Sequence, residues 1–263
     1  MLLSFLLALG LLLAGCGGGS SSSGGSGSSG GGEGGGTLTV FAASSLTNAF
    51  PKIADIYKTQ HPGWDVRFEF LGSDDLAAQI EQGSPADVFA AASSKYPEEL
   101  QSQNLMGTTT NFATNTLVLV VPKDNPAGIK GVADLASTNA KLVVGDPAVP
   151  LGSYTETVLG NLGIDPGSLN IVSQEQKATD VITKVDLGEA DAGFVYVTDA
   201  LAAGAKVKQI PLPAAAQATA TYPIGIVSDS SHKEAAQQWI DLVISPQGQK
   251  VLTDLGFGPA PSS

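Results

Sequence analysis

The sequence predicts an α/β fold for the part of the chain that starts at Thr37. From that residue on, short strand-like runs alternate with runs whose apolar residues recur at helical spacing. Hydrophobic residues make up 43% of the 263 residues, which is enough for a sizeable core. No internal repeat of about 20 to 50 residues, the sign of a solenoid or a propeller, is evident. Strands that alternate with helices usually form a sheet covered by helices, so this order indicates α/β architecture.

Several segments have the composition of strands. The segment 66–70 alternates cleanly, with Val66 and Phe68 on one face and Arg67 and Glu69 on the other. The segment 116–121 is apolar on both faces, as expected of a strand that is covered on two sides. The predicted strands are, in chain order, 38–41, 66–70, 86–92, 116–121, the start of 141–153, 193–197 and 221–227.

Helices are predicted between these strands. After the first strand, apolar residues recur at helical spacing from Leu46 to Tyr57, and Ser44 or Ser45 stands where an N-cap belongs. Further helices are predicted around 71–80, after the loop that ends at Ser153, over 177–185 and over 235–243.

Small or hydroxyl residues stand where three of the predicted strands give way to helices. Ser45, Ser73 and the loop 149–153 ("VPLGS") each follow the carboxyl end of a strand. Ligands of open α/β sheets gather at that edge. A helix N-terminus there offers unpaired N–H groups and a positive dipole end. Helix capping alone explains one such junction, but three of them favour a binding site for an anion.

The first 36 residues differ in composition from the rest. Residues 1–15 are apolar and uncharged, too short for a membrane span and typical of a signal peptide, and they lead into Cys16, the only cysteine. The ending "LAGC" resembles the lipobox of bacterial lipoproteins, although no Lys or Arg precedes the apolar run. We therefore expect cleavage before Cys16 and lipidation of its sulfur. Residues 17–36, almost entirely Gly and Ser, predict a tether spanning on the order of 25 Å, so that 16–36 would hold a folded domain at the outer face of the cytoplasmic membrane.

Charge and absent motifs exclude several functions. A formal net charge of −12 makes nucleic acid and anionic membrane surfaces unsuitable partners. Arg67 is the only arginine and is expected on a solvated strand face, so no bidentate arginine clamp for an anion is expected. His61 and His232 stand in polar, surface-like contexts. No P-loop, G-x-S-x-G elbow, H-E-x-x-H motif or cysteine cluster occurs, so we expect no cofactor and no side-chain metal site.

A serine hydrolase is the main enzymatic alternative, because Ser45 and Ser73 stand where a nucleophile could. The sequence places no plausible base near either serine. The carboxylates Asp74, Asp75 and Asp146 have simpler roles as helix caps and turn formers. We therefore expect a binding protein and not an enzyme.

Six motifs, in their order and at about their spacing, resemble those of the molybdate-binding proteins of bacterial ABC importers. They are "VFAASSLTNAF", "FLGSDDLAAQIEQGSPADVFAAAS", "LVLVVPK", "LVVGDPAVPLGSY", "GEADAGFVYVTDA" and "YPIGIV". The resemblance runs from about Thr37 to Phe257. It implies the two-lobed fold of type II periplasmic binding proteins, in which each lobe is a mixed sheet flanked by helices and the oxyanion lies between the lobes. Lobe I would comprise 37–113 and 225–263, lobe II would comprise 114–224, and the crossings would fall near Asn115 and Tyr222.

The resemblance also implies which groups hold the oxyanion. In that family, main-chain N–H groups and hydroxyls from both lobes bind the dianion. The matching positions are Ser45 and Ser73 (hydroxyl and N–H), Leu151 and Ala178 (N–H) and Tyr196 (phenolic hydroxyl). Leu151 replaces a residue that is more often smaller in the family, and the "KATD" segment around Ala178 matches loosely. Without the resemblance, Tyr196 could equally be a core residue and Leu151 part of the loop packing.

One departure from the family pattern is Asp74, which follows Ser73 at a position that is commonly small or hydroxyl-bearing. A carboxylate that faced a dianion would repel it, so we expect Asp74 to point outward as a helix cap. The family implies that molybdate, and also tungstate, is delivered to a membrane permease driven by a cytoplasmic ATPase. Sulfate or thiosulfate is the alternative ligand, and the protein is expected to be a monomer.

Overall fold

One nine-stranded mixed sheet organises the residues that the computed structural model describes, 35–261. Its strands follow the order β2-β1-β3-β9-β4-β7-β5-β6, and β8 pairs separately with β4. The strands are β1 (Gly36–Ala43), β2 (Trp64–Leu71), β3 (Val88–Ala90), β4 (Met106–Pro122), β5 (Leu142–Gly145), β6 (Ile171–Glu175), β7 (Ala192–Tyr196), β8 (Val207–Ile210) and β9 (Thr219–Val227).

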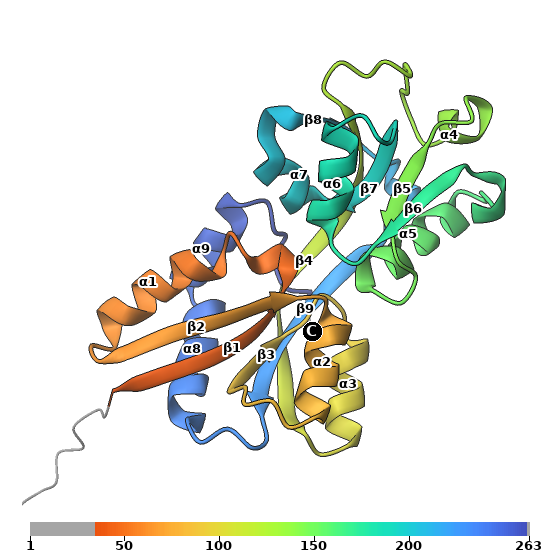
Figure 1. Cartoon of the computed structure of the whole chain (residues 1–263). Coiled ribbons are helices and arrows are strands. Elements are labelled where there is room, and N and C mark those ends of the chain that lie inside the picture. Colours follow the sequence, from red (N-terminus) through yellow and green to blue (C-terminus); the bar gives the residue numbers. More distant parts are fainter. Residues whose placement is uncertain (1–34, 262–263) are drawn as a thin grey trace, which may run out of the picture. The chain divides into compact units, whose positions relative to one another are not determined.

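The long strand β4 joins two sections of this sheet. In the first section, β1 lies parallel to β2 and β3, while β9 pairs antiparallel with β3 and with the β4 residues from Met106 to Thr116. In the second section, β5 lies parallel to β6 and β7, while the β4 residues from Leu117 to Pro122 pair antiparallel with β7 and β8. Figure 1 shows β4 and β9 side by side where the two sections meet.

Helices cover both sections. In the first section, α1 packs on β2, α2 on β1, α3 on β4 and α8 on β9, and in the second section α5 packs on β5 and α6 on β7. None of the helices formed by residues 35–261 is both long and apolar enough to cross a membrane. The helices are α1 (Phe50–Gln60), α2 (Ser73–Glu81), α3 (Lys95–Ser102), α4 (Asp134–Ser137), α5 (Pro150–Asn161), α6 (Ala178–Asp186), α7 (Val197–Ala203), α8 (Lys233–Ile244) and α9 (Pro246–Asp254).

The larger of two hydrophobic clusters runs through both sections and is anchored by aromatic side chains. Trp239 of α8 is fully buried and meets the ring of Phe50 edge to face, with 5.4 Å between the ring centroids, and the ring of Tyr57 at 5.7 Å. A smaller cluster lies beneath α2 and α3 and contains Leu76, Phe89 and Leu100. These contacts explain the helical spacing of apolar residues in α1, α2 and α8.

The predicted α/β fold is confirmed, and the predicted solvated face of β2 is confirmed by the exposure of Arg67 and Glu69.

The predicted start of the first helix is wrong. A short 3₁₀ turn, Ser44–Leu46, follows β1, and α1 begins only at Phe50. Neither Ser44 nor Ser45 caps a helix, because the capping positions are Ala43 and Ala49 and neither makes a side-chain cap. The predicted lobe boundaries remain predictions.

Candidate functional site

A small pocket lies where the carboxyl ends of two sets of parallel strands meet, β1–β3 of the first section and β5–β7 of the second. Its lining comes from residues at or shortly after the ends of these strands. This is the edge at which open α/β sheets bind their ligands. All five residues predicted to hold an anion line this one pocket: Ser45, Ser73, Leu151, Ala178 and Tyr196.

Three helix N-termini meet at this pocket. Ser73 is the first residue of α2, Leu151 is the second residue of α5 and Ala178 is the first residue of α6. The first turn of an α-helix leaves its N–H groups without intrahelical acceptors, and the helix dipole places positive potential there. The pocket wall is therefore rich in hydrogen-bond donors that come from the main chain.

The turn between β5 and α5 brings the N–H of Leu151 to the pocket, and it depends on two glycines. A Cβ on Gly152 would lie 1.9 Å from the main-chain oxygen of Asp146, and a Cβ on Gly145 would lie 2.6 Å from the nitrogen of Gly152. Any larger residue at either position would push the strand and the helix apart. The glycines of the sequence "VVGDPAVPLG" are thus explained by this close approach.

Both serine hydroxyls hold partners behind the pocket that use them as acceptors. The N–H of Ala92 donates to Ser73 Oγ at 3.0 Å. Ser45 Oγ lies 2.9 Å from Tyr222 Oη, which in turn lies 3.4 Å from the amide nitrogen of Asn115. Asn115 can only donate through that nitrogen, so the proton of Tyr222 is free to be donated to Ser45, although either hydroxyl can be the donor in this pair. When Tyr222 donates, the protons of Ser73 and Ser45 are both available for an acceptor in the pocket.

Tyr196 offers a further donor. The residue is 4% exposed, and its hydroxyl is buried and has no hydrogen-bond partner among the described residues. Burial, together with the neighbouring Tyr222, Tyr154 and Asp199, raises the pKa of Tyr196 well above its usual value, so the hydroxyl keeps its proton. A buried hydroxyl without a partner costs about 1–3 kcal/mol, and an acceptor placed in the pocket would remove that cost.

The pocket lining is neutral throughout. Three larger cavities are lined by described residues, and each contains a carboxylate: Asp87 and Asp229 in the first, Asp254 beside Lys52 in the second, and Glu156 in the third. Carboxylates disfavour an anion, so we assign the anion site to the small pocket despite its size. Its free volume of ≈ 20 Å³ is about the room that one water molecule needs, so an ion with four oxygens requires the walls to move apart.

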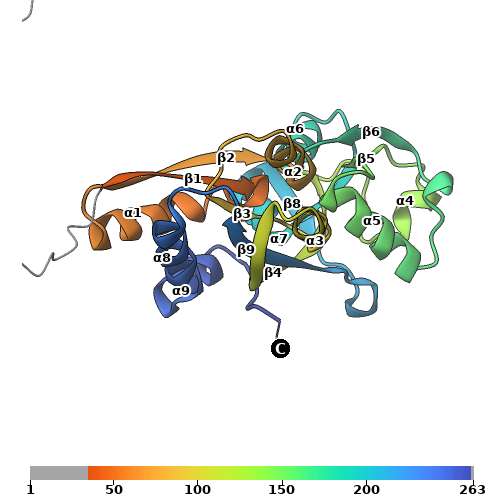
Figure 2. The same cartoon turned by 90° about the horizontal axis from the view of Figure 1, so that it is seen from below.

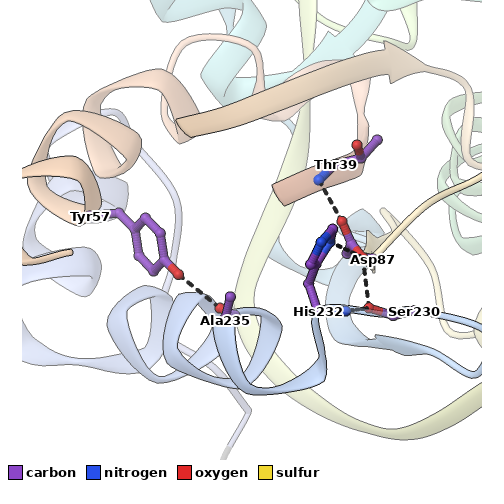
Figure 3. Close-up of polar contacts among 6 residues, drawn as sticks. All are labelled: Thr39, Tyr57, Asp87, Ser230, His232 and Ala235. Carbon is purple, nitrogen blue, oxygen red and sulfur yellow. Dashed lines mark hydrogen bonds and ion pairs between the residues drawn. The ribbon is translucent and has the colours of Figure 1, made fainter. Parts of the chain in front are cut away.

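The histidines lie away from this pocket and are partly exposed, with 38% of the His232 side chain accessible to solvent. His232 precedes α8, and its Nδ1 lies 3.2 Å from Asp87 Oδ1 (Figure 3). The same carboxylate accepts a hydrogen bond from Ser230 Oγ, at 2.7 Å, and one from the N–H of Thr39, at 2.8 Å. This network ties the start of α8 to β1. His61 stacks on Tyr57, with 4.5 Å between the ring centroids.

The expectation that Asp74 points outward as a helix cap is wrong. The side chain makes no capping hydrogen bond, and its Oδ1 is buried without a hydrogen-bond partner. Burial raises the pKa of this carboxyl, and the charges of Asp75 and Asp146 add to the rise. The nearby N–H groups of Asp74 and Asp75 offset part of it without reaching hydrogen-bond geometry. Asp74 does not line the anion pocket either.

A second buried carboxyl, Asp199, was not singled out from the sequence. It is the third residue of α7, it is 8% exposed, and its Oδ2 has no hydrogen-bond partner in the described part of the chain. Burial alone raises its pKa to about 7. The sequence also gave no role to Tyr222 or Asn115 beyond marking the crossings, although a tyrosine and an asparagine within apolar strands were the available signal.

A neutral pocket of converging N–H and hydroxyl donors, set at the carboxyl ends of the parallel strands, has the chemistry that an anion requires. In agreement, residues 38–258 match the model of the bacterial extracellular solute-binding proteins, and the chain belongs to this family. The molybdate-binding protein ModA of Mycobacterium tuberculosis is 41% identical to it over 222 residues, which cover 84% of each chain.

Solved structures agree on the fold. The periplasmic molybdate-binding protein of Azotobacter vinelandii has a TM-score of 0.75 at 24% identity and is matched over 86% of this chain and 100% of its own. The sulfate-binding protein SubI of Mycobacterium tuberculosis also has a TM-score of 0.75, at 17% identity, over 85% of this chain and 86% of its own. At these identities the likeness concerns the fold alone.

Proposed function

We propose that this protein binds molybdate outside the cytoplasm and delivers it to the permease of an ABC importer. The observation that carries the proposal is the buried, unpartnered hydroxyl of Tyr196 in a neutral pocket that Ser45, Ser73, Leu151 and Ala178 also line. The name of the 41% identical relative supports molybdate as the ligand. Tungstate has the same shape and charge, and we propose that it binds as well.

Neutral donors let an acidic protein hold a doubly negative ion. The chain carries a formal net charge of −12, and no charged residue lines the pocket. Each hydrogen bond to a charged acceptor contributes about 1.5–3 kcal/mol, and about seven such donors are assigned. Even after the cost of ordering the ligand, several of them exceed the roughly 8 kcal/mol that micromolar affinity requires.

The donors also define a selectivity. Molybdate, tungstate and sulfate are fully deprotonated near neutral pH and need donors only, whereas phosphate keeps at least one proton that needs an acceptor. Ser73 Oγ already accepts a hydrogen bond from the N–H of Ala92, and Ser45 Oγ is already paired with the hydroxyl of Tyr222. An unpaired phosphate proton costs about 1–3 kcal/mol, so phosphate should bind at least about tenfold more weakly than molybdate.

Calorimetric titration of the full-length protein with molybdate, tungstate, sulfate, thiosulfate and phosphate tests both statements. We expect tight molybdate binding and at least about tenfold weaker phosphate binding. Absence of molybdate binding would refute the proposed function. Phosphate that competes as well as molybdate would refute the donor-only pocket.

A hydrolytic role for the two serines receives no support from their surroundings. Ser45 contacts Tyr222 and Ser73 contacts the N–H of Ala92, and in the described part of the chain neither hydroxyl contacts a histidine or a carboxylate. A serine nucleophile needs such a base. We therefore propose a transport receptor that is not an enzyme.

The remaining proposals concern the assembly. Cys16 lies outside the described residues, and we propose that it carries the lipid that holds the protein at the outer face of the cytoplasmic membrane, after removal of the signal peptide 1–15. The tether, predicted as 16–36, would give the domain reach toward the permease, although its last residue, Gly36, already belongs to β1. We further propose that the protein acts as a monomer, with lobe I at 37–113 and 225–263 and lobe II at 114–224. The lobes would move apart to admit the oxyanion, and the bound ion would then favour their closed arrangement.

A further inference from the structure

A tyrosine outside the anion pocket holds the loop that delivers one of its donors. Tyr96 is the second residue of α3, and its hydroxyl donates to the main-chain oxygen of Ala148 at 2.5 Å. Ala148 lies in the loop between β5 and α5, three residues before Leu151. Figure 2 shows α3 next to α5, although the two helices flank different sections of the sheet.

The position of Leu151 depends on that of Ala148, because hydrogen bonds within the loop between them fix its conformation. The N–H of Ala148 donates to Asp146 Oδ1 at 2.9 Å, and the N–H of Val149 donates to the main-chain oxygen of Asp146 at 3.0 Å. The close approach of Gly145 and Gly152 leaves the turn no room to shift. A shift of Ala148 therefore also shifts the N–H of Leu151.

The other end of the contact is equally well anchored. Tyr96 is 8% exposed and belongs to the cluster beneath α2 and α3. Burial, together with the negative charge of Asp74, raises the pKa of Tyr96 to about 12, so its hydroxyl remains a donor at any physiological pH. Ala92 lies three residues before the start of α3, and its N–H donates to the hydroxyl of Ser73 in the pocket wall. Tyr96 therefore joins the wall that carries Ser73 to the wall that carries Leu151.

We propose that Tyr96 is a positioning residue that fastens the loop 146–151 over the anion pocket and so slows the release of the bound oxyanion. The proposal rests on the proposed function. Tyr96 does not line the pocket, so it should change how long an oxyanion stays and not which oxyanion fits. Two like charges act against the contact: Asp74, beside Tyr96, and Asp146, in the fastened loop, whose charge is felt at Asp74. Because a single hydrogen bond opposes this repulsion, the contact between Tyr96 and the loop can break and let the loop open.

Isotope exchange on the full-length protein measures the release directly. The protein is loaded with molybdate enriched in one molybdenum isotope and mixed with excess molybdate of another, and the isotope retained is followed by mass spectrometry. For Tyr96→Phe we expect release about five- to tenfold faster than for the wild type, as for the loss of one neutral hydrogen bond, with little change in the association rate. Amide hydrogen exchange of the wild type should show that molybdate protects 148–152, independently of any variant.

Tyr57→Phe is the matched control. Tyr57 is also a buried tyrosine whose hydroxyl donates to an alanine carbonyl, that of Ala235 at 3.1 Å (Figure 3). Unlike the pocket residues, Tyr57 belongs to α1 and does not line the pocket. This variant should melt at a lower temperature and release molybdate at the wild-type rate.

The outcomes separate the two proposals. If the wild type binds molybdate and Tyr96→Phe releases it at the wild-type rate, the fastening role is wrong and the proposed function stands. Equal acceleration in Tyr96→Phe and Tyr57→Phe would also overturn the fastening role, since it would reflect general loss of stability. If the wild type does not bind molybdate, both proposals fall.

Discussion

Replacing Tyr196 with Phe removes a single oxygen from the pocket wall and should change two quantities in opposite directions. With molybdate bound, the variant lacks one hydrogen bond to a charged acceptor, which is worth about 1.5–3 kcal/mol. The dissociation constant should therefore rise roughly 10- to 150-fold. Without ligand, the wild type buries this hydroxyl with no partner, so its removal should stabilise the free protein by about 1 kcal/mol or more.

Calorimetric titration with molybdate and thermal melting of the ligand-free protein measure the two changes. For a domain of this size, about 1 kcal/mol corresponds to a rise of about 2–4 °C in the melting temperature. Tyr57→Phe should show the reverse pattern, because it removes a satisfied hydrogen bond to Ala235 away from the pocket: a lower melting temperature with unchanged affinity. Wild-type affinity in Tyr196→Phe would mean that Tyr196 is a core residue, and the reasoning would be refuted.

Two further predictions concern a buried carboxyl and the membrane anchor. The pKa of Asp199 is about 7 in the folded protein against an ordinary 3.8, so between these values the folded state holds the proton more often than the unfolded state, and stability is lost as pH rises from about 4 to about 7. Asp199→Asn should therefore be more stable than the wild type across that range, by at most about 4 kcal/mol at pH 8. Asp180→Asn, at the matching but exposed third position of α6, should show no such gain. Chemical denaturation measures both, and equal gains for Asp199→Asn at pH 4 and pH 8 would contradict the assignment. Cys16→Ala should move the protein out of the membrane fraction of its native host, and unchanged retention in that fraction would rule out the lipid anchor.

The sequence was a good guide to the parts of the fold that repeat a local pattern. The alternation of strands and helices identified most of the parallel strands, and their carboxyl ends marked where the pocket would lie. Ser45 and Ser73 could be chosen for that reason alone. Leu151, Ala178 and Tyr196 came from the family resemblance, because a main-chain N–H leaves no trace in the type of residue that carries it.

What the sequence could not supply depends on contacts between distant segments. Ser45 looked like a helix cap, but its hydroxyl is engaged by Tyr222, 177 positions away. Asp74 looked like an exposed cap, but one of its carboxylate oxygens is buried without a hydrogen-bond partner among the described residues. The short helix α3, which carries Tyr96, was not predicted at all, since eight residues with a Pro near the start give little helical pattern.

A pocket without charged side chains makes the hydrogen bonds to the ion insensitive to the ionic strength around the protein. Salt screens charges that face water over about 8–10 Å at physiological concentrations, but it does not reach N–H and hydroxyl dipoles in a buried wall. The acidic exterior responds differently, because its formal net charge of −12 repels an approaching dianion until salt screens it. Entry of the ion is thus slowest in dilute surroundings and faster in saline ones, whereas the hydrogen bonds that bind it stay the same. For a receptor outside the cytoplasm, the hydrogen bonds to the ion therefore keep their strength when the salt concentration of the medium changes.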